Sequence, residues 1–141
     1  MFSRDVLEVI VKLGSGVTYQ SGQYLFLNVP SVSFLEWHIF SLTSSPNADG
    51  NKIYFHIKES GKWTKEVISA IINNSLWVFL DAFYGHYAKL ALEDNHTEVF
   101  VGGGIGVTTM LSVAMDLCRN NTTPITFIWV VRTIEEFNIS H

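Results

Sequence analysis

The most informative segment of the chain reads Glu36-Trp37-His38-Ile39-Phe40-Ser41-Leu42-Thr43-Ser44-Ser45-Pro46. Because successive side chains of a β-strand point to opposite faces, we expect His38 and Phe40 on one face of a short strand and Ser41 on the other. An aromatic wall, a hydroxyl donor and a basic group near a phosphate are what a flat aromatic cofactor needs from such a strand. The same residues also suit an ordinary half-buried strand of a soluble β-sandwich, and the segment by itself favours that ordinary structure.

Strand patterns flank this segment on both sides. The segments expected to form strands in the first ninety residues or so are Val6–Leu13, Gln23–Val29, Trp37–Thr43, Lys52–Lys58 and Leu76–Leu80. Within Lys52–Lys58 the alternation predicts one apolar face and one face open to water, which includes His56. Apolar residues at helical spacing predict an amphipathic helix over Thr64–Ile72. Strands with short connections and one helix indicate a small antiparallel β-barrel.

The pattern changes after Glu93. A short apolar strand over Glu98–Val101 leads into glycines, then into a helix over Val107–Cys118 with Cys118 on its core face, and then into an apolar strand over Ile125–Val131. A continuous apolar strand is typical of one buried on both faces of a parallel sheet. We therefore expect an α/β unit to follow the barrel, with two domains over residues 1–94 and 95–141.

Composition narrows the possible functions. The chain has 141 residues, a net charge of -4 and no basic cluster, so nucleic acid is not an expected partner. Its single cysteine excludes an internal disulfide. The longest apolar runs are too short to cross a membrane. The histidines His38, His56, His86, His96 and His141 do not have metal-ligand spacing, so no metal site is expected.

The segment Gly102-Gly103-Gly104-Ile105-Gly106-Val107-Thr108-Thr109 lies where a phosphate-binding loop belongs, between a strand and a helix. Glycines allow backbone N–H groups to approach an anion, and the helix N-terminus adds a favourable dipole. Val107 takes the place of the third glycine of a G-x-G-x-x-G motif, and no Gly-Lys-Ser/Thr ending indicates triphosphate hydrolysis. A tight turn without a ligand explains the glycines equally well.

Two further segments suit phosphate groups. Arg132 directly follows the last predicted strand, where an acidic residue would favour a free ribose hydroxyl, and an arginine there suits a 2′-phosphate. Thr64 can cap the first helix after Gly61, and the first helical amides can hold an anion, with Lys58 nearby on the preceding strand. Each residue also has an alternative explanation. Thr64 can be an ordinary helix cap, Trp63 a core residue, and Arg132 a solvated arginine.

Taken in order, these motifs resemble one family. The motifs follow the order found in the ferric reductase and NADPH oxidase group. In chain order they are Gly22-Gln23-Tyr24, the segment from Trp37 to Leu42, His56-Ile57-Lys58 with Gly61-Lys62-Trp63-Thr64, the segment from Asp81 to Gly85, and the glycine loop. The similar part of that group is its cytosolic flavin and nicotinamide module, and the resemblance runs from about Gly22 to Arg132.

The resemblance implies a set of cofactor-binding residues. For FAD these are His38, Phe40, Ser41, Thr43, Lys58, Gly61, Trp63 and Thr64, of which Lys58, Trp63 and Thr64 would hold the pyrophosphate. For NADPH they are Gly102, Gly103, Gly104, Gly106 and Thr108, and the position of Arg132 adds that residue. It also implies hydride transfer from NADPH to the flavin, followed by single-electron transfer to a transmembrane haem domain that is absent from this chain. The final acceptor would be a ferric chelate or dioxygen, and the module itself would lie at the cytosolic face of a membrane. No side chain is expected to act as an acid or base in the hydride step.

Several positions depart from the family pattern. Ile39 and Thr109 stand where family members usually have prolines, and Ala82-Phe83 stands where they have a glycine-proline pair. The chain also reaches His141 after two strands of the nicotinamide-binding sheet. These departures favour a second hypothesis, a non-catalytic, truncated or decayed fragment with weak nucleotide binding at most. A third hypothesis is a nucleotide-binding β-barrel module without a redox role.

Overall fold

The computed structural model describes residues 6–46, 50–73, 77–85, 97–120 and 124–134. The elements run in the order β1 (Val6–Lys12), β2 (Tyr24–Asn28), β3 (Trp37–Ser41), β4 (Lys52–Lys58), α1 (Lys62–Ile72), β5 (Phe79–Tyr84), β6 (Glu98–Gly103), a 3₁₀ turn (Gly104–Gly106), α2 (Val107–Asn120) and β7 (Ile125–Val130). The expected domain boundary, and the predictions made for His86, His96, His141 and Leu76, lie outside the described residues.

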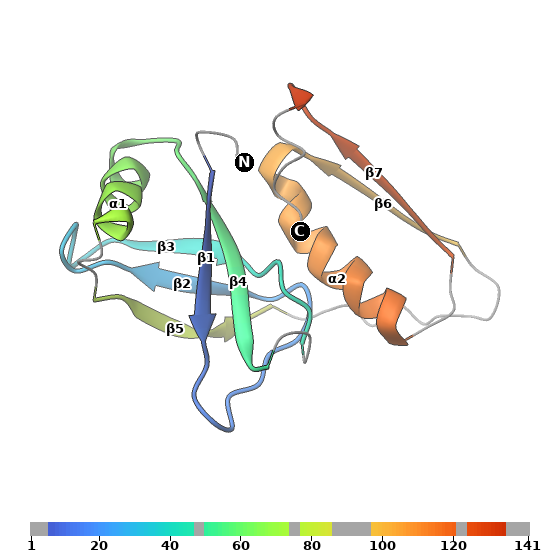
Figure 1. Cartoon of the computed structure of the whole chain (residues 1–141), viewed down its shortest axis with the longest axis horizontal. Coiled ribbons are helices and arrows are strands. Elements are labelled where there is room, and N and C mark those ends of the chain that lie inside the picture. The colour runs from blue at the N-terminus through green and yellow to red at the C-terminus, as the bar shows by residue number, and fades with distance from the viewer. Residues whose placement is uncertain (1–5, 47–49, 74–76, 86–96, 121–123, 135–141) are drawn as a thin grey trace.

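The strands of the described residues form three sheets. β1 pairs with β4, β2 lies between β3 and β5, and both of these sheets are antiparallel, whereas β6 and β7 pair in parallel. Figure 1 shows α1 against the antiparallel strands, and α2 between these strands and the β6–β7 pair. The predicted fold class, an antiparallel barrel with one helix followed by the start of a parallel sheet, is confirmed.

The main core lies inside the antiparallel part. Its buried side chains come from β2, β4, α1 and two connecting segments, and they are Leu25, Leu27, Val29, Leu42, Ile53, Phe55, Ile57, Trp63 and Val67. On β2 and β4 these residues recur at every second position, so one face of each strand turns inward as the alternation predicts. α1 covers one end of this core with Trp63 and Val67.

One prediction for β4 is wrong. His56 was expected on the wet face, but only 6% of its surface is exposed. Its Nδ1 lies 2.9 Å from Thr43 Oγ1, and its Nε2 lies 3.7 Å from a carboxylate oxygen of Glu8, its partner in the β1–β4 register. Alternation indicates only which side chains share a face. The polar partners that make burial of an imidazole acceptable come from β1 and from the segment after β3.

Two predictions for the α/β unit are also corrected. Cys118 is exposed rather than on the core face of α2, whose buried apolar residues are Val107, Val113, Ala114 and Leu117. The buried stripe of α2 is rotated because the helix contacts the barrel as well as its own sheet. β7 alternates between half-buried and exposed residues, so among the described elements only α2 covers the β6–β7 sheet, and only on one face.

Element boundaries differ by a few residues from those expected. α1 begins at Lys62 rather than at Thr64, and β6 continues to Gly103 rather than ending at Val101. β5 runs from Phe79 to Tyr84, whereas the strand was expected to end at Leu80. The segment that begins at Asp81 therefore forms the end of β5 rather than following it. Boundaries are the least certain part of any pattern-based prediction, because the first and last turns depend on capping contacts.

Tyr84, the last residue of β5, has a perturbed ionisation. Its hydroxyl donates to Asp81 Oδ2 at 2.9 Å, and this hydrogen bond to a carboxylate is the largest cause of its raised pKa. We therefore expect the phenol to stay neutral at pH values where an ordinary tyrosine, with a pKa near 10, is half ionised. Asp81→Ala should lower the pKa of Tyr84, as followed by its ring carbon resonance. Glu59→Ala, which removes an exposed carboxylate elsewhere, should leave it unchanged, and equal pKa values in all three proteins would contradict the assignment.

Candidate functional site

The candidate site lies along the edge of β3 that faces β4. β3 pairs along its length with β2, and an isolated bridge connects Leu42, the residue directly after β3, to Phe55 of β4. In the β2–β3 register, Leu25 lies opposite Phe40 and Leu27 lies opposite His38. The expected shared face of His38 and Phe40 is therefore the face that lies over the core.

Four rings gather at this edge. The rings of His38 and Trp63 are stacked, with centroids 3.7 Å apart and planes at 20°. The ring of Phe40 lies 6.3 Å from that of Trp63 at 24°, and 5.6 Å from that of Phe55 at 35°. The predicted residues His38, Phe40 and Trp63 are thus brought together from β3 and α1. Trp63 is buried beneath this group of rings, whereas His38 and Phe40 are half-buried and remain partly open to solvent.

Trp63 carries an unusual polar atom. The residue is 8% exposed, and among the described residues its indole Nε1 has no hydrogen-bond partner. Leaving a buried N–H without an acceptor costs about 1–3 kcal/mol, and such a group in a native protein calls for an explanation. An acceptor atom of a bound molecule could satisfy it only if the side chains that cover Nε1 move aside.

The start of α1 lies beside these rings. Thr64 is the third helical residue rather than the expected N-cap, and its Oγ1 accepts hydrogen bonds from the backbone N–H of Ser60 at 3.0 Å and of Gly61 at 3.1 Å. Its hydroxyl donates in turn to the carbonyl of Gly61 at 3.0 Å. Thr64 therefore holds the turn before α1 in place, while the first helical N–H groups remain suited to an anion.

Three other predicted residues lie near this edge. Ser41 ends β3 and is half-buried, and Lys58 ends β4 opposite Val6. Thr43 is different, because it is 6% exposed and its hydroxyl donates to the carbonyl of Tyr54 at 3.1 Å as well as contacting His56. The hydroxyl of Thr43 therefore makes its contacts inside the barrel.

The glycine loop joins β6 to α2 as expected. Gly104 has φ +49, a left-handed conformation that favours glycine. A Cβ atom at Gly102 would lie 3.0 Å from the Cα of Val107, so the strand and the helix approach as closely as glycine allows. Thr108, which is 7% exposed, donates through Oγ1 to the carbonyl of Ile105 at 3.0 Å. Its hydroxyl therefore closes the loop.

Sequence reasoning missed a tryptophan that supports this loop. Trp129 on β7 donates through Nε1 to the carbonyl of Gly104 at 3.0 Å, and its partner in the β6–β7 register is Gly102. Only the parallel register places Trp129 beside the glycines. Arg132 is exposed and follows the end of β7, at the same edge of the sheet as the loop that follows β6. The structure thus gathers the predicted nucleotide residues at one edge.

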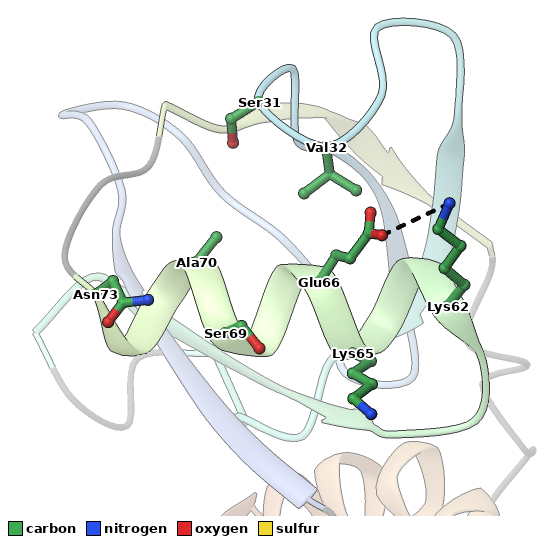
Figure 2. A pocket seen from close by; sticks show the side chains of 8 residues that line it. All are labelled: Ser31, Val32, Lys62, Lys65, Glu66, Ser69, Ala70 and Asn73. Carbon is green, nitrogen blue, oxygen red and sulfur yellow. Dashed lines mark ion pairs between the residues drawn. The ribbon is translucent and has the colours of Figure 1, made fainter.

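A pocket that was not predicted follows the outer side of α1. It has a volume of about 590 Å³, and its lining residues are Ser31, Val32, Lys62, Lys65, Glu66, Ser69, Ala70 and Asn73. Figure 2 shows Ser31 and Val32 on a loop that faces the helix, and Glu66 turned toward Lys62 in an ion pair of 3.8 Å. One end of this pocket therefore reaches the start of α1.

Comparison with known families gives two matches. Residues 1–109 match the family described as FAD-binding domain, and residues 97–141 match the family described as ferric reductase NAD binding domain. NADPH oxidase 1 of Mus musculus is 31% identical over 148 residues, which cover 97% of this chain and 24% of that protein. Ferric reduction oxidase 5 of Arabidopsis thaliana is 31% identical over 139 residues, which cover 95% of this chain and 20% of that protein. The chain thus spans a quarter or less of these relatives.

Solved structures show the same fold at lower identity. The ferredoxin reductase in carbazole 1,9a-dioxygenase has a TM-score of 0.76 and 18% identity, over 96% of this chain and 41% of that chain. A ferredoxin NADP+ reductase from Neisseria gonorrhoeae with bound FAD and NADP has a TM-score of 0.70 and 18% identity, over 96% of this chain and 55% of that one. At this identity, the likeness establishes the fold alone.

Proposed function

This chain belongs to the FAD-binding domain family of the ferric reductases and NADPH oxidases, and from that membership we propose that it binds FAD and NADPH and carries electrons from the nicotinamide to the flavin. FAD supplies the redox chemistry when it is bound, because it accepts a hydride and releases single electrons. The part of the protein is to bind and orient both cofactors and to neutralise their phosphates.

The residues at the β3 edge fit the flavin half of this proposal. The observation that carries it is the arrangement of the rings of His38, Phe40 and Trp63 in nearly parallel planes at this edge. His38, Phe40 and Trp63 would provide the aromatic surface, and Ser41 a hydroxyl donor at the strand end. Thr43 would act indirectly, because its hydroxyl supports the segment after β3 from within.

The start of α1 fits a pyrophosphate. The N–H groups of its first turn would hold the phosphate oxygens, and Lys58 would add positive charge. Gly61 is exposed and nothing surrounds the position of a Cβ there, so an anion can approach the backbone closely. Thr64 would keep this turn in shape through the hydrogen bonds that it makes with Gly61.

The edge of the β6–β7 sheet fits the nicotinamide dinucleotide. The residues proposed to bind it are Gly102, Gly103, Gly104, Gly106, Thr108 and Arg132. Gly103 and Gly106 are exposed and can present backbone N–H groups, while Thr108 fixes the loop from within. The guanidinium of Arg132 suits the 2′-phosphate that distinguishes NADPH from NADH. We propose that residues 1–94 form the FAD-binding domain and residues 95–141 the beginning of the NADPH-binding domain.

We further propose that the electrons leave through a haem-containing membrane domain, with a ferric chelate or dioxygen as the final acceptor. The support is what the relatives are: an NADPH oxidase, a ferric reduction oxidase and a respiratory burst oxidase homolog. The module would lie at the cytosolic face of the membrane. None of the described helices combines the length and the hydropathy needed to cross a lipid bilayer.

Retention of FAD tests this function directly. The purified chain mixed with FAD should keep a bound-flavin absorbance after gel filtration. Phe40→Ala should weaken FAD binding by about 1–3 kcal/mol, because an aromatic surface of the site is lost. Phe79→Ala removes a phenyl ring that is 56% exposed on β5 and serves as the control. A folded, unsubstituted chain that retains no FAD would instead favour the non-catalytic alternative.

A further inference from the structure

A cluster of polar side chains joins α2 to the barrel. Ser21 Oγ donates to Asp116 Oδ2 at 2.6 Å, and Ser45 Oγ donates to Asp116 Oδ1 at 3.4 Å. Ser112 Oγ donates to the carbonyl of Ser44 at 2.6 Å and accepts from the N–H of Gly22 at 3.3 Å. We call Ser21, Ser44, Ser45, Ser112 and Asp116 the serine–aspartate contact.

This contact is buried and directional. Ser21, Ser45 and Ser112 are 2%, 1% and 0% exposed, so their hydroxyls depend on these partners. The 2.6 Å bond from Ser21 involves a carboxylate, which makes it stronger than a bond between neutral groups, whereas the 3.4 Å contact from Ser45 is long. Hydrogen bonds weaken steeply when they are bent, so they fix an orientation more tightly than apolar packing does.

The backbones also approach closely here. Gly22 has φ +78, and a Cβ atom at this position would lie 3.0 Å from Cγ2 of Val113. Ser112, Val113 and Asp116 follow one another along the same side of α2, because residues four apart lie one turn apart. Two barrel segments, one before β2 and one after β3, therefore contact a single helix face.

Each side of the contact is tied to one of the two proposed cofactor sites. Ser44 and Ser45 follow β3, which carries His38, Phe40 and Ser41. Ser112 lies five residues after Val107, where the glycine loop ends and α2 begins, a distance of about 7.5 Å along the helix axis. Figure 1 shows α2 passing beside the antiparallel strands with the β6–β7 pair on its other side. We call β3 the flavin strand and the glycine loop between β6 and α2 the nucleotide loop. The contact thus links the flavin strand to the nucleotide loop through short, regular elements.

We propose that Ser21, Ser112 and Asp116 are positioning residues, which fix the nucleotide loop relative to the flavin strand so that the nicotinamide and the flavin meet in reacting geometry. This inference rests on the proposed function. Hydride transfer requires the reacting atoms to lie roughly 3–3.5 Å apart, and a misplacement of about 1 Å can cost on the order of 100-fold in rate. Neither serine nor aspartate takes part in the chemistry.

The first test measures orientation in the whole chain. Residual dipolar couplings of backbone amides report the direction of α2 relative to β1–β5, with Asp116→Ala and Ser112→Ala as the variants. Arg119→Ala, which changes an exposed residue of the same helix, is the matched control. In the unsubstituted chain and the control, one alignment should fit all elements. In both contact variants α2, β6 and β7 should require a separate or weaker alignment. One common alignment in the contact variants would overturn the proposal.

The second test measures reaction rate in the FAD-loaded chain under anaerobic single-turnover conditions. At saturating NADPH, Asp116→Ala should slow flavin reduction by on the order of 100-fold, with FAD content and the Kd for NADPH little changed. Asp116→Asn, which keeps the shape and one acceptor oxygen, should recover part of the rate. A rate loss explained entirely by a weaker Kd would overturn the positioning role. An unsubstituted chain that binds no FAD would contradict the proposed function instead, and the orientation test would then decide whether the contact fixes the helix.

Discussion

Trp63→Ala is expected to lower the free energy of unfolding of the barrel by about 3–5 kcal/mol, the usual cost of removing a large aromatic side chain from a core. Trp63 is 8% exposed, belongs to the main core, and stacks on His38 at 3.7 Å. The same substitution should abolish retention of FAD, because the ring that joins α1 to β3 is lost. Urea denaturation followed by circular dichroism measures the first effect, and flavin absorbance after gel filtration measures the second.

Two further variants separate packing from hydrogen bonding. Trp77→Ala removes an indole that is 86% exposed, and it should change the free energy of unfolding by about 0.5 kcal/mol or less. Trp63→Phe keeps an aromatic ring and removes the buried N–H that has no partner among the described residues. It should cost much less stability than alanine, yet weaken FAD binding by about 0.5–1.5 kcal/mol, the net value of one hydrogen bond. Equal FAD affinity in Trp63→Phe would show that Nε1 is not a ligand donor.

The barrel strands were predictable because their signal is local. The alternation in Lys52–Lys58 matches β4 at both ends, since apolar residues at every second position define a strand without help from the rest of the chain. The burial of His56 was not predictable in this way. It depends on Glu8 from β1 and Thr43 from the segment after β3, which come together only in the folded barrel.

Motif order predicted which residues belong to the candidate site, although it did not predict the roles of their hydroxyls. His38 and Phe40 were expected on one strand face and Trp63 at the start of the helix, and the structure brings their rings together, with Trp63 in the core. Thr64 and Thr108 both hydrogen-bond to a carbonyl of their own turn. Serine and threonine form such local bonds readily, so their presence in a motif does not distinguish ligand binding from support of a turn.

The parallel register explains what sequence reasoning missed in the nucleotide half. Trp129 lies twenty-five residues after Gly104, and no periodicity connects an indole on one strand to a carbonyl that follows another. Cys118 was placed on the wrong face of α2 for a related reason. The helix packs against the barrel through Ser112 and Asp116, which a pattern of apolar residues does not reveal.

Gly102→Ala is expected to destabilise the unit formed by β6, α2 and β7 by about 1–3 kcal/mol, the usual cost of overpacking. The added methyl group would lie 3.0 Å from the Cα of Val107 and 3.1 Å from its Cγ2. The nearest atom belongs to the backbone at the start of α2, so the helix must shift to accommodate the methyl group. Faster amide hydrogen exchange in α2, with exchange in β1–β4 unchanged, is the expected observation.

Gly103→Ala is the matched control for the fold and also a test of the site. Gly103 has φ -115, which any residue can adopt, and nothing lies within 4 Å of the added Cβ. The amide hydrogen exchange rates of the Gly103→Ala variant should therefore equal those of the unsubstituted chain. If the loop holds the phosphates of NADPH, a methyl group on this exposed backbone should hinder their approach and weaken NADPH binding, as measured by calorimetry, without loss of stability. Equal destabilisation by both substitutions would contradict the close approach at Gly102. Unchanged NADPH binding in Gly103→Ala would mean that the phosphates do not approach the backbone at this residue.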